Sequence, residues 1–140
     1  MPPPSPPPVE RCFSVSIAAC ASASVVCDAT YTDNGADCTN DDGLTYPVYA
    51  NPGGTMFLFA SSGRWWIAPT ACEHSSIVTG SLRSTGTLTD KPTDATYVWR
   101  VYDAAGDGGD GDYSDIDPVM SCNEAPSPPP SPPPSPPPSP

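Results

Sequence analysis

The sequence predicts a small all-β, disulfide-linked antiparallel domain, a meander or a sandwich, flanked by polyproline II segments. Three features lead to this prediction. Short runs alternate between apolar and polar residues, six cysteines occur in 140 residues, and 17 of the 22 prolines lie in two terminal tails. No window longer than ten residues has the apolar spacing of a helix.

Composition divides the chain into three parts. Residues 1–8 form a proline-rich arm, residues 9–125 a cysteine-rich β domain, and residues 126–140 a Ser-Pro-Pro-Pro tail that is expected to be polyproline II. The middle part is large enough for one hydrophobic core. No segment has the ~20 apolar residues needed to span a bilayer, so no membrane span is expected. The net charge of −11 argues against nucleic acid or an anionic membrane as partner.

The first part of the domain combines one strand signal with two weaker segments. Phe13, Val15 and Ile17 alternate with small side chains, which predicts a half-buried strand. The segment Ala18–Val26 is consistent with a short helix. Asp28–Gly43 is rich in Asp, Asn, Thr and Gly and is predicted to be a loop.

The middle of the domain predicts a three-stranded antiparallel meander. Its strands are Leu44–Ala50, Thr55–Ala60 and Arg64–Ala68. The segments between them, 51–54 and 61–63, consist of residues typical of tight turns and have hairpin length.

The strongest strand signal of the chain follows later. Thr96–Tyr102 is dense in β-branched and aromatic residues, which favour strands. Ser75–Gly80 and Leu82–Leu88 are weaker strand candidates.

The cysteines indicate an oxidising compartment. They are Cys12, Cys20, Cys27, Cys38, Cys72 and Cys122. A metal site is disfavoured because there is no CxxC motif and His74 is the single histidine. Three disulfides are expected, with all fifteen connectivities open. No basic and then apolar stretch follows Met1, so we expect that a signal peptide has been removed or that the chain is a segment of a longer protein.

The tails are expected to be stiff rods. Proline fixes φ and pushes the residue before it towards the extended region. A polyproline II helix rises about 3.1 Å per residue, so residues 127–140 would span on the order of 43 Å. The serines recur every four residues while the helix turns once in about three, so they face all directions. A plain spacer without further role is the alternative.

The Ser-Pro-Pro-Pro repeats of both tails resemble those of the hydroxyproline-rich glycoproteins of plant and green-algal cell walls and extracellular fibrils. The resemblance covers the tails only. It implies hydroxylated prolines that carry O-linked arabinose- or galactose-containing chains, with some serines modified as well. The positions to which this applies are Pro2, Pro3, Pro4, Pro6, Pro7, Pro8, Ser127, Pro128, Pro129, Pro130, Ser131, Pro132, Pro133, Pro134, Ser135, Pro136, Pro137, Pro138 and Ser139. No Asn-x-Ser/Thr acceptor for N-glycosylation occurs.

Adjacent tryptophans provide a candidate ligand or partner surface. Trp65 and Trp66 point to opposite faces if they lie on a strand. One is expected in the core and the other on an exposed face with Tyr46, Tyr49 or Phe57, where it would stack on a sugar ring. The alternative is that both tryptophans fill the two sides of a thin sandwich.

Charged residues offer two further candidates. Arg64 and Arg100 either lie over aromatic rings or offset the acidic surface. No cofactor is expected. Asp107, Asp110 and Asp112, within the acidic run 103–117, are nevertheless candidate ligands for Ca²⁺, although the run departs from an EF-hand loop. A solvated acidic loop is the alternative.

These features predict a structural extracellular glycoprotein, a self-associating unit of a wall, matrix or filament. A carbohydrate-binding module on a proline-rich spacer, with a polysaccharide as partner, is the alternative function. No catalytic motif surrounds any serine, and no enzyme is expected.

Overall fold

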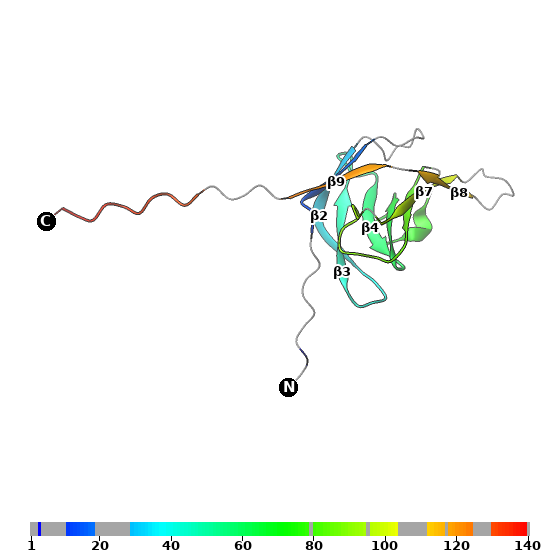
Figure 1. The fold of residues 1–140 in the computed structure, drawn as a ribbon, viewed down its shortest axis with the longest axis horizontal. Helices are drawn as coiled ribbons and strands as arrows, with labels where there is room; N and C mark the ends of the chain where they lie inside the picture. Colours follow the sequence, from blue (N-terminus) through cyan, green and yellow to red (C-terminus); the bar gives the residue numbers. More distant parts are fainter. Residues whose placement is uncertain are drawn as a thin grey trace.

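The computed structural model describes residues 3, 11–18, 29–78, 80–94, 96–103, 112–116, 118–124 and 130–139. Within them, nine antiparallel strands form one curled sheet (Figure 1). The strands are β1 (Ser14–Ala18), β2 (Ala29–Thr39), β3 (Thr45–Ala50), β4 (Phe57–Ser61), β5 (Arg64–Ala68), β6 (Leu82–Thr85), β7 (Val98–Asp103), β8 (Asp112–Ile116) and β9 (Val119–Asn123). A 3-10 turn, η1 (His74–Ser76), is the one helical element among the described residues. The predicted all-β, disulfide-linked antiparallel fold is confirmed.

The order of the strands explains why the sheet curls. Strands β1 to β7 each pair with the next, and β9 pairs with β1, so β8 and β9 are the two edges. Only two residues separate Ile116, the end of β8, from Val119, the start of β9. Three residue steps span at most about 11 Å. The sheet therefore bends round until its two edges approach each other, and we call this line of approach the seam.

The predicted central meander is confirmed. Strands β3, β4 and β5 pair in sequence, with Tyr49 opposite Leu58 in the first pair. At the first turn, the Asn51 side chain accepts hydrogen bonds from the backbone N–H groups of residues 55 and 56 at 2.9 and 3.1 Å. At the second, Ser62 and Gly63 both have positive φ, as a two-residue hairpin turn requires.

The predicted loop Asp28–Gly43 is wrong, because most of it is the long strand β2. Tyr31 lies opposite Val15 of β1 and is fully buried, and Cys38 is buried near the other end. Between them the register with β3 shifts, and Gly35 adopts a φ of 84°. A polar strand with two buried side chains separated by a bulge shows no alternation in its sequence, which explains the error.

Four other segments differ from their predictions. Ser75–Gly80 is no strand in its described part, which begins in η1. Leu82–Leu88 ends earlier, since β6 stops at Thr85. The acidic run includes a strand, β8, rather than loop alone. Phe13 precedes β1 and is 48% exposed. The helix considered for Ala18–Val26 lies outside the described residues, apart from Ala18, the last residue of β1.

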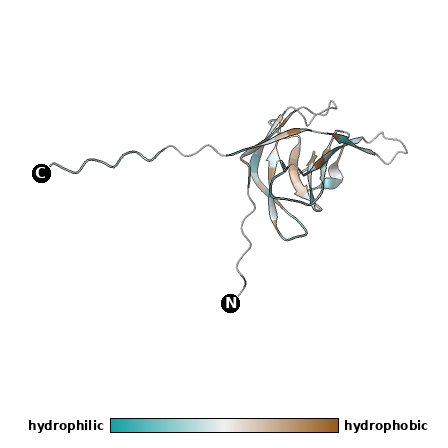
Figure 2. Ribbon diagram, viewed as in Figure 1, coloured by the Kyte–Doolittle hydropathy of each residue, from teal (hydrophilic) through white to brown (hydrophobic). Residues whose placement is uncertain are grey.

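The central strands are buried on both faces. Figure 2 shows hydrophobic residues, in brown, along them. The inner face of the curled sheet packs Tyr49, Leu58 and Trp65 into the main core. On the outer face, Phe59 and Trp66 form a second cluster, against which Ala71 and Ile77 of the connection from β5 to β6 pack. Apolar side chains are thus buried on both faces of the sheet.

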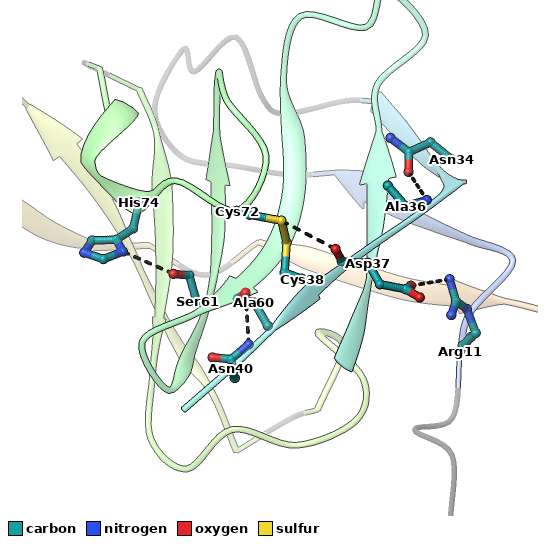
Figure 3. The surroundings of a disulfide bond; sticks show 10 residues. All are labelled: Arg11, Asn34, Ala36, Asp37, Cys38, Asn40, Ala60, Ser61, Cys72 and His74. Carbon is teal, nitrogen blue, oxygen red and sulfur yellow. Dashed lines mark hydrogen bonds and ion pairs between the residues drawn. A yellow bond between two sulfur atoms is a disulfide. The ribbon is translucent and has the colours of Figure 1, made fainter. Parts of the chain in front are cut away.

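Two disulfides fasten this arrangement. Cys12, just before β1, bonds to Cys122 on β9 across a Cα–Cα distance of 5.4 Å. Cys38 on β2 bonds to Cys72 in the covering connection, 5.5 Å apart (Figure 3). Cys20 and Cys27 lie outside the described residues, so the third expected bridge stays a prediction. Disulfides are typical of proteins that function outside the cytosol.

No helix within the described residues is long and apolar enough to cross a membrane.

Candidate functional site

The described part of the C-terminal tail is fully accessible. Residues 130–139 belong to no helix or strand, and each is exposed (Figure 1). All ten of these residues are predicted modification positions, and Pro3 of the N-terminal arm is exposed as well. The other predicted modification positions, Pro2, Pro4, Pro6, Pro7, Pro8, Ser127, Pro128 and Pro129, lie outside the described residues. Any enzyme that modifies the described prolines or serines meets no steric barrier from the sheet.

The predicted exposed aromatic platform is wrong. Tyr46, Tyr49 and Trp65 are buried in the main core, with at most 2% of their surface exposed. Trp66 is 5% exposed and lies in the second cluster, where the His74 ring stacks on it at 5.2 Å. The alternative, in which the two tryptophans fill opposite sides of a thin sheet, describes the structure.

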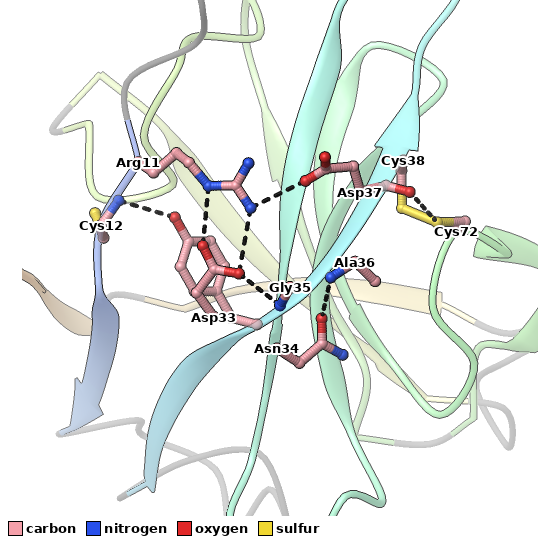
Figure 4. Close-up of polar contacts among 10 residues, drawn as sticks. Arg11, Cys12, Asp33, Asn34, Gly35, Ala36, Asp37, Cys38 and Cys72 are labelled. Atoms are coloured by element: carbon pink, nitrogen blue, oxygen red, sulfur yellow. Dashed lines mark hydrogen bonds and ion pairs between the residues drawn. A yellow bond between two sulfur atoms is a disulfide. The ribbon is translucent and has the colours of Figure 1, made fainter.

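The two tyrosines serve as polar anchors instead. The Tyr49 hydroxyl accepts a hydrogen bond from the Cys12 backbone N–H at 3.0 Å, deep in the core. Next to it, Arg11 bonds to the carboxylates of Asp33 and Asp37 at 2.9 and 3.0 Å (Figure 4). These contacts raise the pKa of Arg11, with the hydrogen bond to Asp33 as the largest cause. The start of the domain is thereby fixed to β2 and β3.

Tyr46 makes the fold sensitive to alkali. Burial, and then the hydrogen bond from its hydroxyl to Asp42, raise the pKa of Tyr46 to about 12. Because the folded protein favours the neutral phenol, its contribution to stability is complete below the ordinary pKa of 10 and is lost as the pH rises towards 12. We expect unfolding in this window, measured by circular dichroism against pH. Burial also raises the pKa of Tyr31 and Tyr49, so Tyr46→Phe should remove part of the slope, and an unchanged curve would contradict the contribution of Tyr46.

A groove opens at the seam of the sheet. It has a volume of about 460 Å³ and lies between the residues before β7, the end of β8 and the start of β9. Tyr97 and Trp99, which belong to the main core and are 8% and 5% exposed, reach its lining with their rings edge to face, 6.4 Å apart. Val98 and Val119, also in its lining, are 46% and 61% exposed. We call this the seam groove.

The chemistry of the seam groove suits an apolar, rigid ligand. Pro92 and Pro118 add to its lining, and among the lining residues that the structure describes Asp94 alone is charged. Exposed apolar residues that gather at a hollow commonly mark an interaction site. The sequence prediction missed this site because Trp99 and Val119 come together only through the curl of the sheet. Only the strand predicted at Thr96–Tyr102 contained the aromatic residues of this groove.

The remaining predicted side chains have varied positions. Arg64 lies over the Trp66 ring at 5.9 Å, while Arg100 forms an ion pair with Asp115 at 2.9 Å. No cluster of metal-ligating side chains occurs among the described residues. Asp107 and Asp110 lie outside them, as does the side chain of Asp112 on β8, so the calcium site stays a prediction.

Comparison of the chain with protein-family models, with curated proteins and with solved structures found no match.

Proposed function

We propose that the chain is a structural extracellular glycoprotein, a unit of a wall, matrix or filament whose (hydroxy)proline rods carry O-linked glycans. The observation that carries this proposal is the fully exposed Ser-Pro-Pro-Pro repeat attached to a disulfide-linked β domain. A polyproline rod has no internal hydrogen bonds, so its backbone needs water or sugar as partner.

In this proposal the units assemble through their rods. The proline tail of one copy lies in the seam groove of the next. Aromatic-lined grooves recognise polyproline II segments because the rod is already ordered and loses little entropy on binding. Val98 and Val119 supply the exposed apolar contact, and the rings of Tyr97 and Trp99, 8% and 5% exposed, add a small aromatic area. The uncharged tail meets described lining residues of which Asp94 alone is charged.

The occupant is a second copy rather than the chain's own tail. Strand β9 starts at the groove with Val119 and ends at Asn123, four residues further on. It therefore carries the chain about 13 Å away from the groove before the tail begins. To reach the seam groove of its own copy, the stiff tail would have to reverse its direction. A contact between the tail of one copy and the groove of the next is heterologous, and its repetition gives an open fibre when the rotation from copy to copy does not close a ring.

The modification is tested by the mass of native protein. We expect a mass well above the 14.5 kDa of the polypeptide, with the excess removed by chemical deglycosylation and mapped to the tails. Hydroxyproline should appear in the amino-acid analysis. Native protein with bare, unhydroxylated tails would overturn the glycoprotein proposal.

The docking is tested by titrating a synthetic peptide with the sequence of residues 127–140 into the domain, using tryptophan fluorescence. Val119→Asp should weaken binding about tenfold or more, because it places an unpaired charge in an apolar contact. Phe13→Asp makes the same change at another exposed apolar residue and should have no effect. Equal effects of the two variants, or no binding by the unmodified domain, would overturn the docking.

The alternative function, a carbohydrate-binding module that stacks sugars on Trp65, Trp66, Tyr46 or Tyr49, has no supporting geometry, since these rings are buried.

A further inference from the structure

Arginines gather on the outer face of strands β5 to β7. Arg83 of β6 lies directly opposite Trp66 of β5 and Arg100 of β7. Arg64 lies two residues before Trp66, on the same face of β5. We call Arg64, Arg83 and Arg100 the arginine face. It holds three of the five Lys and Arg residues of a chain whose net charge is −11.

Aromatic rings, rather than carboxylates, support two of these arginines. The guanidinium of Arg83 lies 3.5 Å from the ring centroid of Tyr113, and that of Arg64 lies 5.9 Å from the ring of Trp66. Such cation–π contacts hold a guanidinium in place without neutralising it. Arg100 alone has an ion pair, with Asp115, among the contacts described for the three.

The arginines repel one another. Arg83 and Arg100 lie directly opposite each other on paired strands, and like charges in this position destabilise a sheet. Arg83 is also partly desolvated, and its Nε is buried without a hydrogen-bond partner in the described part of the chain. Burial first, and then the charges of Arg64 and Arg100, lower the pKa of Arg83. An anion that bridges these guanidinium groups would relieve the repulsion.

We propose that the arginine face binds an acidic polysaccharide, through sulfate or carboxylate groups repeated along the sugar chain. Strands lie about 4.8 Å apart, so β5 to β7 together span about 10 Å, and Arg64 lies two residues along β5 from the row of Trp66, Arg83 and Arg100. This spread suits a ligand with several charges rather than a single small anion. Guanidinium groups bind both kinds of oxyanion in bidentate fashion.

The arrangement of the three arginines supports a ligand with several negative charges. The choice of a polysaccharide among such ligands rests on the proposed extracellular role. The site lies on the outer face of β5 to β7 and is distinct from the seam groove. A unit with both sites would bind its neighbours by proline docking and a charged matrix by the arginine face.

The test uses the full recombinant chain without glycans, so its result does not depend on tail modification or on assembly. Binding of dextran sulfate, polygalacturonate, neutral dextran and polyglutamate is measured by calorimetry. We expect binding of one or both acidic polysaccharides that weakens with salt, and none of neutral dextran. The two acidic polymers separate sulfate from carboxylate recognition.

Matched arginine variants locate the site. Arg83→Gln and Arg64→Gln should each weaken binding about tenfold and lower the salt dependence by on the order of one counterion. Arg11→Gln, which removes the same charge beside Asp33, should leave binding unchanged. Near-UV circular dichroism checks that the variants are folded. Equal loss in all three variants, no binding, or binding of polyglutamate as tight as that of the polysaccharides would overturn the proposal.

Discussion

Loss of the Cys12–Cys122 disulfide is expected to lower the free energy of unfolding by about 5 kcal/mol, a large part of the stability of a domain this size. The bridge joins residues 110 apart in sequence. It therefore restricts nearly the whole unfolded chain, and the entropy that it removes from the unfolded state grows with the logarithm of loop length. The measurement is urea unfolding of the Cys12→Ala/Cys122→Ala double variant.

The second disulfide provides a matched comparison. Cys38 and Cys72 are 34 residues apart, so Cys38→Ala/Cys72→Ala should cost about 1 kcal/mol less than removal of the longer bridge. Both variants replace a bonded pair by two alanines, which keeps the chemical change equal. A greater loss from the shorter bridge would mean that local packing, rather than chain entropy, determines the contribution of each bond.

The longer bridge also affects the proposed docking site. Cys122 lies on β9, which pairs with β1 alone and supplies Val119 to the seam groove. An edge strand with one partner depends strongly on any additional attachment. The variant that lacks this bridge should consequently bind the tail peptide more weakly, even under conditions in which the rest of the sheet remains folded.

Elements with strong local signals were predictable from the sequence. The alternation of Val15 and Ile17 with small residues identified β1, and the β-branched and aromatic run around Trp99 identified β7. Turn residues at Asn51–Gly54 and Ser61–Gly63 identified the central meander. In each case the information lies within a few consecutive residues.

Features that depend on distant residues were not predictable. Strand β2 has a polar sequence and owes its conformation to partners on both sides, β1 and β3. The seam groove requires that β8 and β9, neighbours in sequence, lie at opposite edges of a curled sheet. The arginine face likewise depends on strand register. A single sequence contains no local signal for any of these relations.

The adjacent tryptophans show the same limit. Their opposite orientation follows from strand geometry, but which faces are covered depends on the connection from β5 to β6. Residues 69–81 place His74 over Trp66, whereas Trp65 lies inside the curl of the sheet. Local sequence thus predicts that the two side chains point apart and leaves the exposure of each undetermined.

Trp65→Ala is accordingly expected to destabilise the fold by about 5 kcal/mol, at the upper end of the range for buried aromatic residues. Trp65 packs edge to face on Tyr46 at 5.8 Å, and its indole N–H donates to the Thr89 carbonyl at 3.1 Å. The change leaves a cavity in the main core and an unsatisfied carbonyl. The measurement is urea unfolding, and Trp65→Phe, which retains most of the ring, should lose substantially less.

Trp66→Ala should cost less, about 3 kcal/mol, because the residues over its ring lie near the surface and are free to move into the space. His74 is exposed, and Arg64 has a long, adaptable side chain. The same substitution removes the ring beneath Arg64, so it should also weaken polyanion binding, whereas Trp65→Phe should not. If Trp66→Ala proves more destabilising than Trp65→Ala, the outer cluster rather than the inner core dominates the stability of this sheet.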